Sequence, residues 1–153
     1  METTDLVLRK TISVARPPDV AFRVFTEEVP SWWPARTHSI GHERVDSVVL
    51  EARVGGRFYE RLDDGTEHDW GRITIWDPPE RLCMTWHPGR GPETAQQLEI
   101  RFVAEDQGTR VELEQRGWET LGDEAEATLA NYESGWTGVF GQYAEAVEEA
   151  RAA

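Results

Sequence analysis

The sequence is poor in cysteine and in cationic side chains. Its 153 residues include one cysteine, Cys83, and 16 lysines and arginines against 29 aspartates and glutamates, so the net charge is −13. A single cysteine excludes an internal disulfide and is typical of a reducing compartment, so we expect a cytoplasmic protein. The excess negative charge repels phosphate groups, so nucleic acid is not an expected partner.

Long apolar runs are also missing. Asp5, Arg9 and Lys10 interrupt the apolar residues near the N-terminus, which excludes the continuous apolar stretch of a signal peptide or a membrane span there. We therefore expect no membrane insertion. The length fits one domain, residues 1–153.

Motifs for cofactors or metals are sparse. Gly55-Gly56 lies between two expected strands, so it offers no helix N-terminus to a phosphate. His38 and His42 have the spacing of a helical metal pair, but Gly41 between them favours a loop. We predict no metal and no cofactor, and we expect Cys83 to be a small buried apolar residue.

Alternation of apolar and polar residues predicts a sheet. A first strand is expected over residues 6–14, where Leu8, Ile12 and Val14 alternate with polar neighbours. Turn-forming residues then separate short alternating runs, as in an antiparallel meander. The further strands are expected at 47–54, 57–62, 67–76, 81–87, 96–104 and 109–118.

Helical spacing occurs after the first strand and again at the C-terminus. The prolines of Pro17-Pro18 suit the first turn of a short helix ending near residue 27, and 29–34 is expected to be a turn or a second short helix, followed by a loop over 35–46. A long helix is expected after Gly122, with an apolar stripe. Glycines inside it each cost about 1 kcal/mol relative to alanine. We expect close approach to the sheet, or room for a ligand, to offset that cost at Gly135, Gly138 and Gly141.

These elements predict an α+β fold: a curved seven-stranded antiparallel sheet wrapped around a long C-terminal helix, with two short helices after the first strand. That helix is the only element long enough to cover the apolar face of the sheet. A bent sheet that closes over one helix leaves a space between them, where apolar ligands bind.

Several motifs, in this order and spacing, resemble the helix-grip fold of the START and birch-pollen-allergen-like (SRPBCC) superfamily. The nearest branch is that of the C-terminal domain of activators of the heat-shock-protein ATPase. The motifs are PPDVAF at 17–22, WWP at 32–34, VGGRFYE at 54–60, DG at 64–65, WGRI at 70–73, WDPPERL at 76–82, TW at 85–86 and GW at 135–136. This resemblance implies one of several functions, since the superfamily includes lipid carriers, hormone receptors, polyketide cyclases and chaperone activators.

Aromatic and aliphatic residues expected on the inner faces are candidates to line a ligand cavity, or else to fill a solid core. They are Trp33, Phe58, Ile73, Met84, Trp86, Ile100, Leu113, Trp136 and Phe140. Glu51, Arg53, Tyr59 and Glu60 were expected on neighbouring strands. They could supply polar anchors or an acid–base pair, with Tyr59 and Arg53 orienting a carbonyl or carboxylate and Glu51 as base, or they could form a salt-bridged outer face.

The primary hypothesis is therefore a module that binds a small hydrophobic ligand, lipid-like or aromatic. One alternative is an enzyme of the cyclase or hydrolase kind acting on a hydrophobic substrate, which would use Glu51, Arg53 and Tyr59. Another is a module that binds a protein partner such as a chaperone, as the family resemblance implies. Both a monomer and a homodimer are compatible with the sequence.

Overall fold

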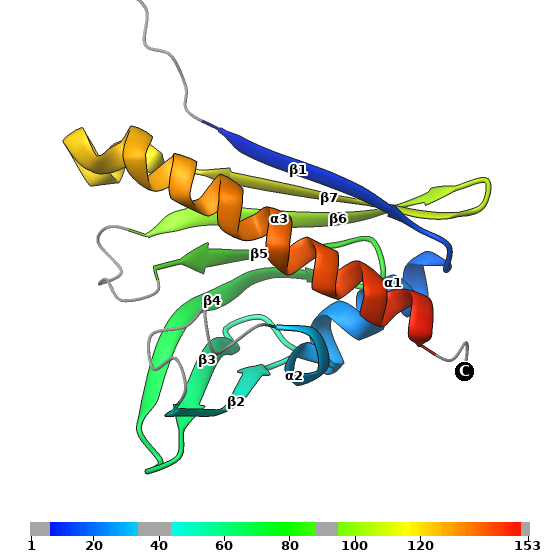
Figure 1. Ribbon diagram of the computed structural model, residues 1–153, viewed down its shortest axis with the longest axis horizontal. Coiled ribbons are helices and arrows are strands. Elements are labelled where there is room, and N and C mark those ends of the chain that lie inside the picture. Colours follow the sequence, from blue (N-terminus) through cyan, green and yellow to red (C-terminus); the bar gives the residue numbers. More distant parts are fainter. Residues whose placement is uncertain (1–6, 34–43, 88–94, 151–153) are drawn as a thin grey trace, which may run out of the picture.

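The computed structural model describes residues 7–33, 44–87 and 95–150. Seven antiparallel strands form one curled sheet in the order β1-β7-β6-β5-β4-β3-β2, and the long helix α3 runs across it (Figure 1). The expected α+β helix-grip architecture is confirmed. None of the described helices is both long and apolar enough to cross a membrane.

The strands follow the turn signals of the sequence closely. They are β1 Leu8–Val14, β2 Val45–Leu50, β3 Arg57–Leu62, β4 Glu67–Asp77, β5 Arg81–Trp86, β6 Gln96–Glu105 and β7 Gly108–Arg116. The helices are α1 Pro18–Glu27, α2 Val29–Trp32, the 3-10 helix η3 Trp118–Glu124 and α3 Ala125–Glu149. The segment that was expected to be a turn or a short helix is thus the short helix α2.

Two strands, β2 and β7, end earlier than predicted by two residues or more. Strand β2 ends at Leu50 and not at residue 54, because the chain folds into tight turns in which Arg53 N donates to Glu51 O (2.9 Å) and Gly56 N to Arg53 O (2.9 Å). Strand β7 ends before Trp118, which begins the unpredicted η3. Gly117 reverses the chain there with a φ of +89°, a conformation that favours glycine.

The curl of the sheet is concentrated in β4, its longest strand. The pairing of β4 shifts register on both sides, against β3 between Phe58 and Tyr59 and against β5 between Ile73 and Ile75. Register shifts of this kind bend and twist a sheet. Strands β2, β3 and the first half of β4 therefore run at a steep angle to β5, β6 and β7, and β2 lies beside α2 (Figure 1).

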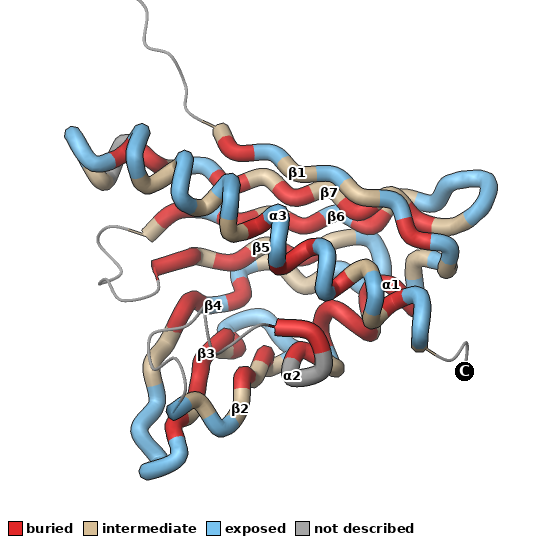
Figure 2. The backbone as a smooth tube through the Cα atoms, viewed as in Figure 1, coloured by how far each residue is buried: buried red, intermediate tan, exposed pale blue. Residues whose placement is uncertain are grey.

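One continuous core lies between the inner face of the sheet and the helices, and its buried residues appear in Figure 2. Helix α3 contributes a stripe of buried residues, and its Tyr143 hydroxyl donates to the Ala21 backbone oxygen of α1 (2.6 Å). Between Ala125 and Trp136, by contrast, α3 buries no side chain completely. The second half of α3 therefore anchors it to the sheet and α1 more strongly than the first.

Gly138 and Gly141 lie on the exposed side of α3, and a Cβ at either position would meet nothing within 4 Å. The expected close approach and the expected room for a ligand are therefore both wrong at these two positions. We predict that Gly138→Ala and Gly141→Ala each stabilise the fold by about 1 kcal/mol, because alanine loses less backbone entropy in a helix. Urea unfolding measures this, and a loss of stability in either variant would contradict it.

Candidate functional site

Aromatic rings from different elements meet at one end of the core. Trp33 lies 4.9 Å from Trp70 and 5.8 Å from Trp136, measured between ring centroids. Trp86 lies 5.6 Å from Trp136 and 5.7 Å from Phe58. We call these five residues the tryptophan cluster. Edge-on and tilted contacts at such distances are favourable for aromatic side chains.

The local structure explains how the cluster is positioned. Trp33 follows α2 directly, because the helix ends where the Trp33 backbone N–H bonds back to Val29 O (2.9 Å). Trp86 is the last residue of β5, and Trp136 begins the well-buried half of α3. The cluster thus joins α2, the end of β5 and α3 at the end of the sheet where β6 begins.

All the apolar candidates of the sequence prediction are buried and belong to the one core. Phe58, Trp33, Trp86 and Trp136 meet in the cluster. The remaining candidates continue the buried core on β4 to β7 and α3; they are Ile73, Met84, Ile100, Leu113 and Phe140. Trp70, which was not among the candidates, is 1 % exposed and also belongs to the cluster.

The rings of the cluster touch one another, since their centroid separations lie between 4.9 and 6.2 Å. Rings at these separations are in van der Waals contact, which leaves no benzene-sized gap between them. A ligand at this site must therefore lie against the cluster, or displace one of its rings.

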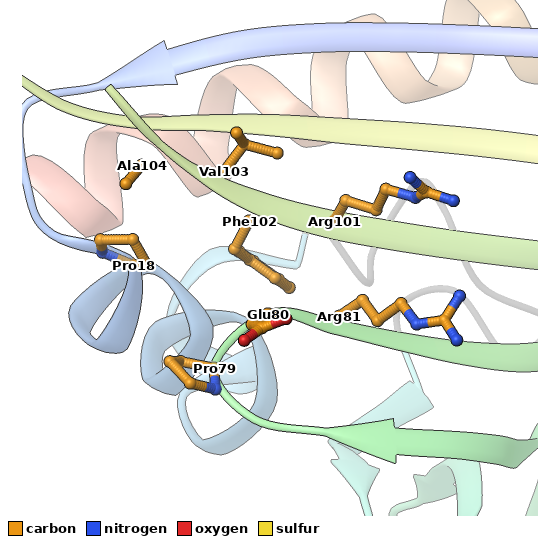
Figure 3. Close-up of a pocket in the computed structure, with 8 residues that line it drawn as sticks. All are labelled: Pro18, Pro79, Glu80, Arg81, Arg101, Phe102, Val103 and Ala104. Atoms are coloured by element: carbon orange, nitrogen blue, oxygen red, sulfur yellow. The ribbon is translucent and has the colours of Figure 1, made fainter. Parts of the chain in front are cut away.

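A groove of about 570 Å³ lies at the opposite end of β5, where Pro18, Pro79 and Phe102 form an apolar patch (Figure 3). Arg81 and Arg101 border it, but both guanidinium groups already contact a Glu99 oxygen, at 2.9 and 3.0 Å. Both arginines that border this groove are therefore already paired with a carboxylate.

The indole N–H of Trp86 differs from those of neighbouring tryptophans. Trp86 is 2 % exposed, and its Nε1 has no hydrogen-bond partner within the described part of the chain. The corresponding N–H groups of Trp70 and Trp136 donate to side-chain oxygens at 2.8 Å. A buried donor without an acceptor costs about 1–3 kcal/mol, so this group needs an acceptor that the described residues do not provide.

A pair of buried glutamines lies beside the cluster. Gln115 on β7 is fully buried and accepts from Trp136 Nε1 through its side-chain oxygen (2.8 Å), while its own amide donates to Gln96 Oε1 (3.4 Å). The Gln115 backbone oxygen also accepts from Trp118 Nε1 (2.8 Å). Strict alternation along β6 and β7 places both glutamines on the inner face, so the pattern itself was a signal for a polar patch in the core.

A buried carboxylate lies on the other side of the cluster. Glu60 on β3 is 0 % exposed, and it accepts from Trp70 Nε1 at Oε1 (2.8 Å) and faces His68 Nδ1 at Oε2 (3.0 Å). Glu60 and His68 are directly paired across β3 and β4, so their side chains share a face. The sequence prediction included Glu60 among polar anchors but did not identify His68 as its partner.

The other predicted polar residues lie elsewhere. Glu51 and Arg53 are in the turn after β2 and not on a strand; Glu51 accepts from the Arg57 backbone N–H (2.8 Å), and the Arg53 side chain is 67 % exposed. Tyr59 alternates with the inward Phe58, and its ring packs under the Arg57 guanidinium at 3.9 Å. Glu51 and Arg53 therefore belong to an ion-paired outer surface, and Tyr59 is buried beneath Arg57 and Arg61, outside the tryptophan cluster.

Cys83 lies on the outer face of β5, because its neighbours Leu82 and Met84 point into the core. It is half-buried, which corrects the expectation of a fully buried residue. Desolvation raises the pKa of its thiol above the ordinary value, and the nearby Glu99 carboxylate raises it further.

A raised pKa lowers the fraction of reactive thiolate at a given pH. We therefore predict that iodoacetamide alkylates Cys83 of the folded protein at pH 8 at least about threefold more slowly than it alkylates the urea-unfolded chain. Mass spectrometry of timed samples measures both rates. Faster alkylation in the folded state would contradict the prediction.

No group of three or more histidine, cysteine, aspartate or glutamate side chains within 7–33, 44–87 and 95–150 is arranged to hold a metal ion. His38 and His42 lie outside the described residues. The predicted absence of a metal thus stays a prediction.

Several solved structures resemble this chain. A search of curated proteins gives no match. Among solved structures, the anthrahydroquino-gamma-pyrone synthase Txn09, determined as a complex, is 35% identical over 92% of this chain and 97% of its own, with a TM-score of 0.63. The self-sacrificing resistance protein CalC from Micromonospora echinospora is 27% identical over 97% of each chain, with a TM-score of 0.70.

The Aha1 dimer from Colwellia psychrerythraea is 14% identical over 94% of this chain and 97% of its own, with a TM-score of 0.70, which shows a shared fold. The family model described as activator of Hsp90 ATPase homolog 1-like protein matches residues 15–148. The resemblance stated from the motifs is thereby confirmed. The chain belongs to the activator of Hsp90 ATPase homolog 1-like family, a family of the SRPBCC type.

Proposed function

We propose that this protein binds a small aromatic molecule against the tryptophan cluster, between the inner face of the sheet and the first half of α3. The observation that carries the proposal is the buried Trp86 N–H, which lacks an acceptor within the described residues. An oxygen of the ligand, either a carbonyl or a phenol, would accept from it. The surrounding rings would contribute apolar contact area.

The burial pattern of α3 supports a ligand at this position. Its first half buries no side chain completely between Ala125 and Trp136, so it is held less tightly than the second half. A flat molecule entering there would contact Trp136 on the helix and Trp86 on the sheet, whose centroids lie 5.6 Å apart. Burial of apolar surface would supply most of the affinity, at about 25 cal/mol per Å².

The more similar solved proteins support an aromatic ligand over a lipid. Txn09, at 35% identity, is named an anthrahydroquino-gamma-pyrone synthase. The Aha1 likeness, at 14% identity, concerns the fold alone, so we do not propose a chaperone partner on its account.

Quenching of tryptophan fluorescence tests the proposal, with 1,4-dihydroxyanthraquinone as the probe. The wild type is expected to bind it, and Trp86→Phe, which keeps an aromatic ring but removes the indole N–H, is expected to bind about tenfold more weakly. Trp76→Phe is the matched control, because Trp76 is partly buried and contacts Phe22 of α1, away from the cluster. Absence of binding by the wild type, or equal affinity of the Trp86→Phe variant, would refute the proposal.

A further inference from the structure

Two buried glutamines lie at the end of the sheet where α3 begins (Figure 1). Gln96 is the first residue of β6 and is 2% exposed, and Gln115 near the end of β7 is 0% exposed. We call these two residues the glutamine pair. The nearest part of α3 buries no side chain completely between Ala125 and Trp136, so the pair lies under the less tightly packed half of that helix.

The contact with Trp136 determines which way the Gln115 amide points. An indole N–H only donates, so the Gln115 atom that meets Trp136 Nε1 at 2.8 Å is the carbonyl oxygen. The amide nitrogen of Gln115 therefore faces the other way, toward the Gln96 carbonyl oxygen at 3.4 Å. An amide donor and an amide acceptor thus face each other inside the core.

The contact between these two amides is long. Well-formed N–H···O bonds have heavy-atom separations of about 2.7–3.2 Å, and the 3.4 Å between Gln115 Nε2 and Gln96 Oε1 exceeds that range. An amide nitrogen carries two hydrogens, and across 7–33, 44–87 and 95–150 this is the one bond that Gln115 Nε2 makes. The buried donor therefore has one weak bond and a second hydrogen without an acceptor in those ranges.

The glutamine pair adjoins the Trp86 N–H, which also lacks an acceptor in the part of the chain that the structure describes. Trp86 and Gln96 are directly opposite each other in the β5–β6 ladder, and both are buried in the core. Side chains paired in this way have Cβ atoms about 4.5–5.5 Å apart. The Trp136 ring lies 5.6 Å from that of Trp86, and its N–H bonds to Gln115. A molecule that lies against these two indoles therefore borders the glutamine pair directly.

We propose that the glutamine pair recognises a hydroxyl group of the bound aromatic molecule, while the Trp86 N–H donates to a carbonyl oxygen of the same molecule. The hydroxyl oxygen accepts from Gln115 Nε2, and the hydroxyl hydrogen is donated to Gln96 Oε1. Two short hydrogen bonds then replace one long contact. This inference rests on the proposed ligand site and names its ligand class, an aromatic ketone that carries a separate hydroxyl group.

A hydroxyl fits between the two amides better than other oxygen groups, because it both donates and accepts. A carbonyl or an ether oxygen would accept from Gln115 but would place a second acceptor against Gln96 Oε1. A site arranged to bond a hydroxyl discriminates against an analogue that lacks it, since buried polar groups are then left unpaired. Gln96 and Gln115 are therefore specificity-determining residues.

Three matched ligands test this recognition at about pH 7, where a phenol is neutral. They are 1-tetralone, which is a two-ring aromatic ketone, and its 7-hydroxy and 7-methoxy derivatives. We expect 7-hydroxy-1-tetralone to bind the wild type about tenfold more tightly than 1-tetralone does. The methoxy compound is expected to bind no more tightly than 1-tetralone, because it cannot donate to Gln96. Titration followed by proton NMR of the ligand measures the three affinities.

Gln96→Met removes the acceptor and keeps a side chain of similar length. We expect its affinity for 7-hydroxy-1-tetralone to fall about tenfold, and its affinity for 1-tetralone to change less than about threefold. The control is Gln97→Met, the same substitution at the exposed neighbour, which is expected to keep both affinities. In the wild type, nitrogen NMR is expected to show a larger shift of the Gln115 amide signals with the hydroxy compound than with 1-tetralone. The ligand series and these signals decide the question even if Gln96→Met fails to fold.

Equal affinity of the wild type for 1-tetralone and 7-hydroxy-1-tetralone would overturn the recognition of a hydroxyl, and so would equal affinity for the hydroxy and methoxy compounds. The ligand site would still stand in either case if 1,4-dihydroxyanthraquinone binds the wild type and binds Trp86→Phe more weakly. Absence of binding of 1,4-dihydroxyanthraquinone and of all three tetralones would overturn the ligand site, and the recognition of a hydroxyl with it.

Discussion

Replacing Gly71 with alanine is expected to destabilise the fold by about 3 kcal/mol, near the upper end of what overpacking costs. A Cβ at this position would overlap the Thr85 backbone oxygen and lie 2.9 Å from its carbonyl carbon. Backbone atoms of a paired strand cannot rotate away as the end of a side chain can. Relief would therefore require β4 and β5 to separate at the point where Arg72 N donates to Thr85 Oγ1 (3.0 Å).

Urea unfolding and thermal melting measure the effect, which corresponds to roughly 6–12 °C in Tm for a domain of this size. Gly138→Ala is the matched control, since the same added methyl group meets open space there and is expected to have the opposite sign. A Gly71→Ala variant as stable as the wild type would mean that the two strands are further apart than the structure shows.

Most of the fold could be predicted from local patterns, because each element carries its own signal. Alternation placed the strands, and turn residues such as those at 63–65 separated them. The prediction fails where contacts between backbone segments far apart in the sequence determine the register and the ends of strands. The register shifts of β4 appear only in its pairing with β3 and β5, and the early end of β2 depends on turns closed by Gly56. Neither contact leaves a periodic trace in the sequence.

The candidate site was predictable in its apolar part and less so in its polar part. Burial follows from alternation, so Phe58, Met84 and Trp136 could be assigned to the core without knowing their neighbours. For a polar residue at an inward position, alternation does not indicate its role, because that role depends on a partner that the pattern does not identify. Glu60 and His68 are eight positions apart, and only the β3–β4 register shows that they face each other.

Two buried polar side chains, Gln115 and Glu60, lie around the same tryptophans. Gln115 satisfies Trp136 on one side and Glu60 satisfies Trp70 on the other, whereas Trp86 is left without an acceptor in the described chain. Each satisfied indole is held in one orientation by its bond. Hydrogen bonds thus fix the Trp136 and Trp70 rings, and in the function proposed above this preorganisation would lower the entropic cost of binding a ligand.

Replacing Gln115 with leucine is accordingly expected to cost about 3 kcal/mol, although leucine is apolar and of similar size. Gln115 is fully buried, and its amide oxygen accepts from Trp136 Nε1 at 2.8 Å while its amide nitrogen donates to Gln96 Oε1 at 3.4 Å. Leucine leaves a buried indole donor and a buried amide without these partners, at about 1–3 kcal/mol for each unsatisfied group. The gain in apolar burial offsets part of this cost.

The matched control is Gln97→Leu, the same substitution at an exposed glutamine of β6, which is expected to change the unfolding free energy by less than about 0.5 kcal/mol. Urea unfolding measures both variants, and the fluorescence of the native state reports whether Trp136 becomes more mobile in Gln115→Leu. If Gln115→Leu proves as stable as the wild type, the Trp136 N–H has another acceptor. The orientation of the Trp136 ring in the tryptophan cluster would then depend on a different contact.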